Sequence, residues 1–175
     1  AEDPDELMAL MAAPQSQCLA IIREHQGYVA QTHGGGLLAY FGFPRAAENA
    51  AQQAVQTALQ LVGQAYAGLE LRVGVHSGMV ISGDAQLPDA IGAASGLAIR
   101  LRQVVDGGEV AISGATQRLV EGFFECDFLG SRQLRGIAKS VDVFRVTRES
   151  GARGRLEARA VWTPLVGRQL ELEKL

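Results

Sequence analysis

The stretch Gly27–Gly42 constrains the fold of this chain more than any other part of the sequence. Two mainly apolar runs, Tyr28–Thr32 and Leu37–Phe41, lie on either side of three consecutive glycines, Gly34–Gly36. Hairpin turns favour glycine because their central residues take positive φ angles. The stretch therefore predicts two strands joined by a tight turn. A phosphate-cradling loop is disfavoured, because such a loop runs directly into the N-terminus of a helix.

The periodicity of apolar residues and the residues typical of helix ends predict the other elements. Asp3-Pro4-Asp5-Glu6 is typical of a helix start, and Pro14 should kink or interrupt the helix that follows. Ser113 should cap a short helix that ends at Val120. The remaining predicted helices cover residues 45–67 and 91–105, and the remaining predicted strands cover residues 69–81, 109–112, 123–129 and 141–146.

This order of elements favours an α/β sandwich with a mixed or mainly antiparallel sheet and helices on one face. A chain of 175 residues is long enough for about one domain with a substantial core. With 47% hydrophobic and 20% charged residues it has the composition of a globular protein. The net charge of −3 gives no reason to expect a nucleic-acid or anionic-membrane partner.

Several features predict a cytoplasmic protein. Cys18 and Cys126 are far apart and lack a C-x-x-C neighbour, which favours buried free thiols over a metal or redox site. The acidic N-terminus does not resemble a signal peptide, and no apolar run reaches the ~18 residues that span a bilayer. The chain begins without Met in the lead-in to a helix, which suggests a fragment. His33 and His76 are expected to be hydrogen-bonded structural residues rather than metal ligands.

Four blocks in order resemble the class III nucleotide cyclases, the family of adenylyl and guanylyl cyclases. They are the hairpin at Tyr28–Gly42, Leu71–Gly78 (close to R-V-G-I-H-T-G), Gly92–Leu101 (close to G-x-x-x-N-x-A-x-R-L), and Leu134–Val146 (close to the closing L-K-G-I-x-x-P-V and last strand). The resemblance covers residues 1–148. It implies a ferredoxin-like core that dimerises head to tail and forms active sites at the dimer interface.

In that family one subunit provides two Asp residues that bind two metal ions, Mg²⁺ or Mn²⁺. The other subunit provides base-reading residues, an orienting Asn and an Arg that stabilises the transition state. The resemblance places the first metal Asp on a strand upstream of Ala1. It places the second on Gly35, which has no side-chain ligand atom, although these ions require carboxylate oxygens. No cofactor is therefore expected in this form, and Mg²⁺ or Mn²⁺ only if the domain is active.

The other family positions are partly retained. The two base-reading positions correspond to Gln31 and Asp89, and the orienting Asn corresponds to Gly96. The catalytic Arg corresponds to Arg100. Alternatively, Gln31 is a strand surface or interface residue, Asp89 is a helix cap and Arg100 is a solvated or dimer-interface residue. The segment between Asp84 and Asp89 is shorter than is usual in the family.

A basic phosphate partner near the closing motif is expected at Arg135 or Lys139. Residues 149–162 are predicted to be a linker. Thr163–Arg168, within the segment 163–175, resembles the entry to an AAA-like or signal-transduction ATPase module, with an unrelated helical extension as the alternative.

These substitutions favour a degenerate cyclase homology domain that acts as a dimerisation or regulatory module, as a homodimer or with another cyclase domain. One alternative is an active adenylate cyclase that converts ATP to cyclic AMP and diphosphate, with Asp84 or Asp89 reaching the metal ions. A second is a module that binds a nucleotide without turnover through Gln31, Asp89 and Arg100. A guanylyl cyclase is the least favoured, because Gln31 is not the acid expected to read guanine.

Overall fold

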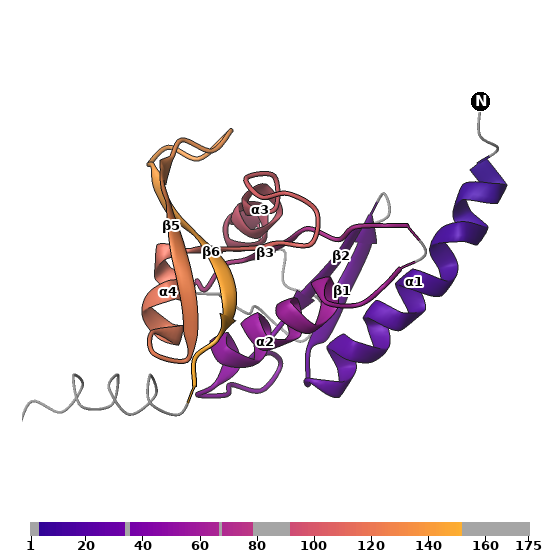
Figure 1. The fold of residues 1–175 in the computed structure, drawn as a ribbon, viewed down its shortest axis with the longest axis horizontal. Helices are drawn as coiled ribbons and strands as arrows, with labels where there is room; N and C mark the ends of the chain where they lie inside the picture. Colours follow the sequence, from indigo (N-terminus) through magenta and orange to yellow (C-terminus); the bar gives the residue numbers. More distant parts are fainter. Residues whose placement is uncertain (1–3, 34–35, 67, 79–91, 152–175) are drawn as a thin grey trace, which may run out of the picture.

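The computed structural model describes residues 4–33, 36–66, 68–78 and 92–151, which form an α/β fold (Figure 1). The helices are α1 (Pro4–Glu24), α2 (Ala50–Val62), α3 (Gly92–Leu101) and α4 (Gly114–Val120). The strands are β1 (Tyr28–His33), β2 (Gly36–Tyr40), β3 (Val73–Val75), β4 (Val110–Ser113), β5 (Phe124–Arg132) and β6 (Val141–Glu149).

The strands form two separate sheets within the described residues. The four-stranded sheet has the order β3-β4-β6-β5, in which β3 and β4 are parallel and the other neighbours are antiparallel. The second sheet is the predicted hairpin, in which β1 pairs with β2 antiparallel, from Tyr28 opposite Tyr40 to His33 opposite Gly36. The mixed, mainly antiparallel arrangement agrees with the sequence prediction.

Helices cover both faces of the four-stranded sheet, so the prediction of helices on one face was wrong. Alternate residues of a strand point to opposite faces. Val110 and Ile112 of β4 belong to a cluster with Val55 of α2 and Val120 of α4. The residue between them, Ala111, packs with Leu97 and Leu101 of α3. All four β4 residues are buried, which removes the polar alternation that would have identified an exposed face.

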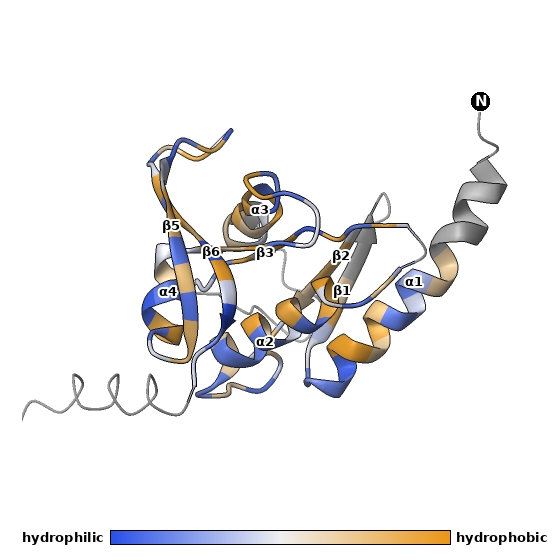
Figure 2. Ribbon diagram, viewed as in Figure 1, coloured by the Kyte–Doolittle hydropathy of each residue, from blue (hydrophilic) through white to orange (hydrophobic). Residues whose placement is uncertain are grey.

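A third cluster holds the hairpin against the first two helices. It is formed by Cys18, Ile21 and Ile22 of α1 with Leu61 and Tyr66, and Leu37, Ala39 and Phe41 pack against it. Figure 2 shows β2 as a hydrophobic strand, whereas hydrophilic and hydrophobic residues alternate along β5. The hairpin therefore owes its position to the helices rather than to strand pairing with the larger sheet.

Four boundary predictions need correction. Helix α3 ends at Leu101, whereas the sequence predicted a helix to residue 105. Helix α1 runs through Pro14 without interruption. Helix α2 begins at Ala50 rather than residue 45, directly after Asn49, and ends before Gly63. Strand β3 has three residues, whereas the sequence predicted residues 69–81 as a strand and its exit. The apolar residues Leu69 and Leu71 before Val73 are not part of the strand and instead pack against the cluster that contains Cys18 of α1.

The described helices contain no segment that combines the length and the apolar character needed to cross a membrane. The predicted linker and the start of an ATPase module lie outside the described residues, because the description ends at Gly151.

Candidate functional site

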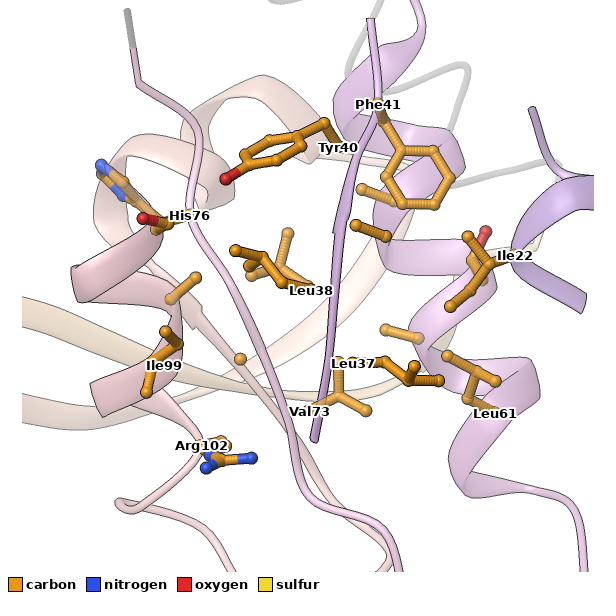
Figure 3. Close-up of a pocket in the computed structure, with 18 of the residues that line it drawn as sticks. Ile22, Leu37, Leu38, Tyr40, Phe41, Leu61, Val73, His76, Ile99 and Arg102 are labelled. Atoms are coloured by element: carbon orange, nitrogen blue, oxygen red, sulfur yellow. The ribbon is translucent and has the colours of Figure 1, made fainter. Parts of the chain in front are cut away.

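A large cleft separates the hairpin from the four-stranded sheet (Figure 3). Its volume is about 850 Å³, and its walls come from α1, β2, α2, β3 with its flanking residues, and α3. Strands β2 and β3 both line the cleft, while none of the described residues of their sheet partners β1 and β4 does so. Each of these two strands thus has one edge without a strand partner among the described residues, and both edges border the same cleft.

The β2 wall divides its side chains between two directions. Figure 3 shows Leu37 and Phe41 on the side of Leu61 and Ile22, and Leu38 and Tyr40 on the side of α3. The Tyr40 hydroxyl hydrogen-bonds Ser95 of α3, and burial raises the pKa of Tyr40 although this bond opposes the rise. One contact therefore connects the hairpin with α3 across the cleft.

A hydrogen-bonded cluster at the ends of β3 and β4 contains His76. Its Nδ1 lies 2.8 Å from Oγ of Ser113, which also accepts a bond from the backbone N–H of Thr116 at 3.3 Å. Thr116 Oγ1 in turn donates to Oγ of Ser77 at 3.1 Å. Burial lowers the pKa of His76. The structure thus confirms that Ser113 is a helix cap and that His76 is a hydrogen-bonded residue.

The connection between these two residues was not predicted from the sequence. His76 and Ser113 are 37 positions apart and come together because β3 and β4 are parallel, with Val75 opposite Ile112. The signal in the sequence was a helix-capping Ser and a strand-terminal His. Neither feature indicates its partner, because the pairing of strands distant in sequence is not encoded in local periodicity.

Arg100 and Gly96 lie on one face of α3, as their spacing of four requires. Arg100 is half-buried, and its Nη1 donates a hydrogen bond to the Gly96 carbonyl oxygen at 2.8 Å. The Arg100 guanidinium also lies beside Gly136, in the turn that follows β5. The predicted phosphate partners Arg135 and Lys139 are exposed residues of the same loop between β5 and β6.

The other predicted site residues are not brought into this geometry. Gln31 lies on β1, where its backbone is opposite Leu38 of β2. Gly35 and Asp89 lie outside the described residues, as does the segment between Asp84 and Asp89. The roles assigned to Gln31, Asp89, Arg100, Arg135 and Lys139 therefore stay predictions.

The described residues do not assemble a two-ion metal site. Gly35, to which the family resemblance assigns the position of a metal-binding Asp, lies outside them. Across the described ranges, no group of three or more His, Cys, Asp or Glu side chains is placed to hold a metal ion. Hard divalent cations need several oxygen ligands at one point.

Neither cysteine has the surroundings of a reactive thiol. Both are free, Cys18 is buried and Cys126 is half-buried on β5. Burial, together with the charge of Asp127, raises the pKa of Cys126 to about 11. A thiol with this pKa is almost entirely protonated at neutral pH and is a poor nucleophile.

The fold resembles solved cyclase domains. One is the guanylate cyclase domain of RhGC from Catenaria anguillulae in complex with GTP, with a TM-score of 0.71, 22% identity, and coverage of 85% of this chain and 87% of that one. Another is the adenylyl cyclase CyaB from P. aeruginosa, with a TM-score of 0.69, 22% identity, and coverage of 83% and 84%. At such identities the likeness establishes the fold, and it confirms the predicted class III cyclase fold.

Sequence relatives point the same way. The chain is 32% identical over 149 residues to candidate adenylate cyclase 3 of Rhizobium meliloti (strain 1021). This match covers 82% of this chain and 25% of that protein. It spans between 18% and 38% of the lengths of the curated relatives it matches. The family model for the adenylate and guanylate cyclase catalytic domain matches residues 1–147. The chain therefore belongs to the adenylate and guanylate cyclase catalytic domain family.

Proposed function

We propose that this chain is a degenerate cyclase homology domain, which acts as a dimerisation or regulatory module in intracellular cyclic-nucleotide signalling and has little turnover of its own. The observation that carries this proposal is the presence of glycine at residues 35 and 96, to which the family resemblance assigns the positions of the metal-binding Asp and the orienting Asn. The two losses fall in opposite halves of a shared active site. A homodimer therefore lacks both groups in each site.

The expected magnitude of this effect is large. Removing a single group that stabilises a transition state typically costs about 10²–10³ in rate. Two losses in one site place turnover far below that of an intact cyclase. The proposal includes cytoplasmic location, a homodimer or a heterodimer with another cyclase domain, and an ATPase module that begins near Thr163 in a longer protein.

The decisive experiment measures cyclic AMP formed from ATP with Mn²⁺. It compares the natural sequence, extended upstream of Ala1, with Gly35→Asp and with the double variant Gly35→Asp/Gly96→Asn. A silent natural sequence together with activity in the double variant supports the proposal. Turnover by the natural sequence that Arg100→Ala abolishes overturns it and favours the active adenylate cyclase.

The structure adds one requirement to this experiment. A Cβ at Gly96 would lie 2.9 Å from Nη1 of Arg100, so an Asn at this position displaces the guanidinium from its contact with the residue 96 carbonyl. Because the far end of an Arg side chain is flexible, the helix backbone can stay where it is. The double variant therefore restores the Asn and moves Arg100 at the same time, and Gly96→Ala is the matched control for the movement alone.

Nucleotide binding without turnover is the second candidate function. The specific observation in its favour is that Arg135 and Lys139 lie exposed on the loop that contacts Arg100, which leaves both ammonium and guanidinium groups accessible to a phosphate. Saturable, metal-insensitive binding of a fluorescent ATP analogue that weakens in Arg135→Ala or Lys139→Ala supports this function. Arg118→Ala is the control, because Arg118 is an exposed Arg on α4.

We further propose that the first strand of the domain, which the family resemblance places upstream of Ala1, occupies the cleft between β2 and β3. Both strands present an edge to the cleft, and its walls carry apolar side chains such as Leu38, Ile99 and Val73. The chain extended upstream should then show a higher melting temperature than the 175-residue chain. Equal melting temperatures would exclude this placement while leaving the proposed loss of turnover untouched.

A further inference from the structure

The guanidinium of Arg100 is bound to its own helix on one side. Its Nη1 donates to the Gly96 carbonyl oxygen at 2.8 Å, and the space that a Cβ of residue 96 would fill lies 2.9 Å from this same nitrogen. This separation is closer than real Cβ atoms approach a neighbour. The back-folded conformation of Arg100 therefore depends on the absence of a side chain at Gly96.

On its other side the guanidinium lies against Gly136. A Cβ on Gly136 would be 3.2 Å from Nη2 of Arg100, 3.8 Å from Cζ and 4.0 Å from Nε. The guanidinium thus borders the space that a side chain of residue 136 would take. Gly136 has a φ of +77°, a left-handed conformation that favours glycine for a separate reason.

The turn that contains Gly136 packs on α3 through apolar side chains. Leu134 is buried in a cluster with Leu97 and Leu101 of α3, and Ile137 packs against this cluster. The Ile137 N–H donates to the Leu134 carbonyl at 3.0 Å and closes the turn. Apolar contacts thus hold the turn on α3, and the Arg100 guanidinium lies beside its Gly136.

The Arg100 contact does not depend on an ion pair with the described part of the chain. The ion pairs found there involve Arg145 with Glu109 and Asp127, and Arg148 with Glu125. The guanidinium instead bonds the Gly96 carbonyl oxygen and lies beside the position that a side chain of residue 136 would take.

We propose that Arg100 is a positioning residue whose guanidinium fastens the turn at residues 134–137 to helix α3, and that Gly96 and Gly136 provide the space for this contact. We call the contact the Arg100 latch. It does not rest on the proposed function, because it concerns how one loop of the domain is held. It does imply that an anion must compete with the latch for the guanidinium.

Amide hydrogen exchange of the turn tests the latch. Arg100→Ala should speed exchange at residues 134–137 severalfold, because the guanidinium that lies beside Gly136 is removed. Arg102→Ala is the matched control, because Arg102 is an exposed Arg two residues further along. Exchange in Arg100→Ala that equals exchange in Arg102→Ala overturns the proposal.

Gly96→Ala gives a second readout that a generally structural residue would not produce. Alanine is a better helix former than glycine, so the melting temperature should not fall, while the displaced guanidinium loosens the turn. The expected results are faster exchange at residues 134–137 and faster labelling of Arg100 by phenylglyoxal. Unchanged exchange and unchanged labelling in Gly96→Ala overturn the latch, and this test remains available even if Arg100→Ala fails to fold.

Discussion

Ser113→Ala should destabilise the domain more than any other loss of a single hydroxyl described above. The Ser113 side chain is 1% exposed, caps helix α4 through the Thr116 N–H, and contacts Nδ1 of His76. Loss of an N-cap costs about 1 kcal/mol. Leaving Nδ1 of the half-buried His76 without its hydrogen bond costs about 1–3 kcal/mol more. We therefore expect about 3 kcal/mol of lost stability.

The assay is thermal and urea unfolding followed by circular dichroism. In a domain of this size, 1 kcal/mol shifts the melting temperature by about 2–4 °C, so Ser113→Ala should lower it by roughly 6–12 °C. Ser131→Ala is the control, because Ser131 is an exposed residue whose hydroxyl donates to Asp142. It should change stability by less than about 0.5 kcal/mol. Similar small effects of both substitutions would refute the reasoning that the cluster is cooperative.

Three further predictions concern pH, packing and thiol chemistry. Because burial lowers the pKa of His76, the unfolded chain binds more protons than the folded chain as pH falls below about 6.5, so the contribution of His76 to stability is complete above that pH and is lost below it. His76→Gln should flatten this part of the curve of stability against pH, and an unchanged curve would refute the role of His76. Gly74→Ala should destabilise the folded domain by about 3 kcal/mol or more in urea unfolding, because the added Cβ would meet the Ala98 carbonyl oxygen and lie 2.8 Å from the backbone nitrogen of Arg102. Full stability of this variant would contradict the close packing of β3 on α3. Cys126, with its pKa raised to about 11, should react with iodoacetamide at pH 8 about 100-fold more slowly in the folded chain than in urea, and equal rates would disprove its protection.

Local sequence signals were sufficient for most of the elements. The hairpin, the Ser113 cap and the two long C-terminal strands each had a local cause, namely a glycine turn, a capping hydroxyl and alternating apolar residues. The start of α2 was predicted five residues early, because residues 45–49 continue the alanine-rich pattern although the helix begins only after Asn49. The predicted break at Pro14 was wrong, because the packing of Cys18, Ile21 and Ile22 stabilises the part of α1 that follows Pro14.

Less of the candidate site could be predicted from the sequence. Motif spacing identified Arg100 and Gly96 as neighbours, and the structure brings them together. It did not indicate that the guanidinium of Arg100 lies beside Gly136, because these residues are 36 positions apart. The faces of the sheet were also misjudged, since Val110, Ala111 and Ile112 are all apolar and carry no sign of which helix each one contacts.

The separation of the two sheets has a consequence for how the domain unfolds. Strands β1 and β2 share no hydrogen-bonded strand ladder with β3–β6 in the described part of the chain, and α1 and α2 hold them mainly through the cluster around Cys18 and Leu61. Cooperative units of a protein follow such contact boundaries. The hairpin with α1 should therefore open at a lower free energy than the four-stranded sheet. A ligand or segment that contacts both walls of the cleft would join the two units into one transition, so its arrival would be visible as sharper unfolding before any chemistry is measured.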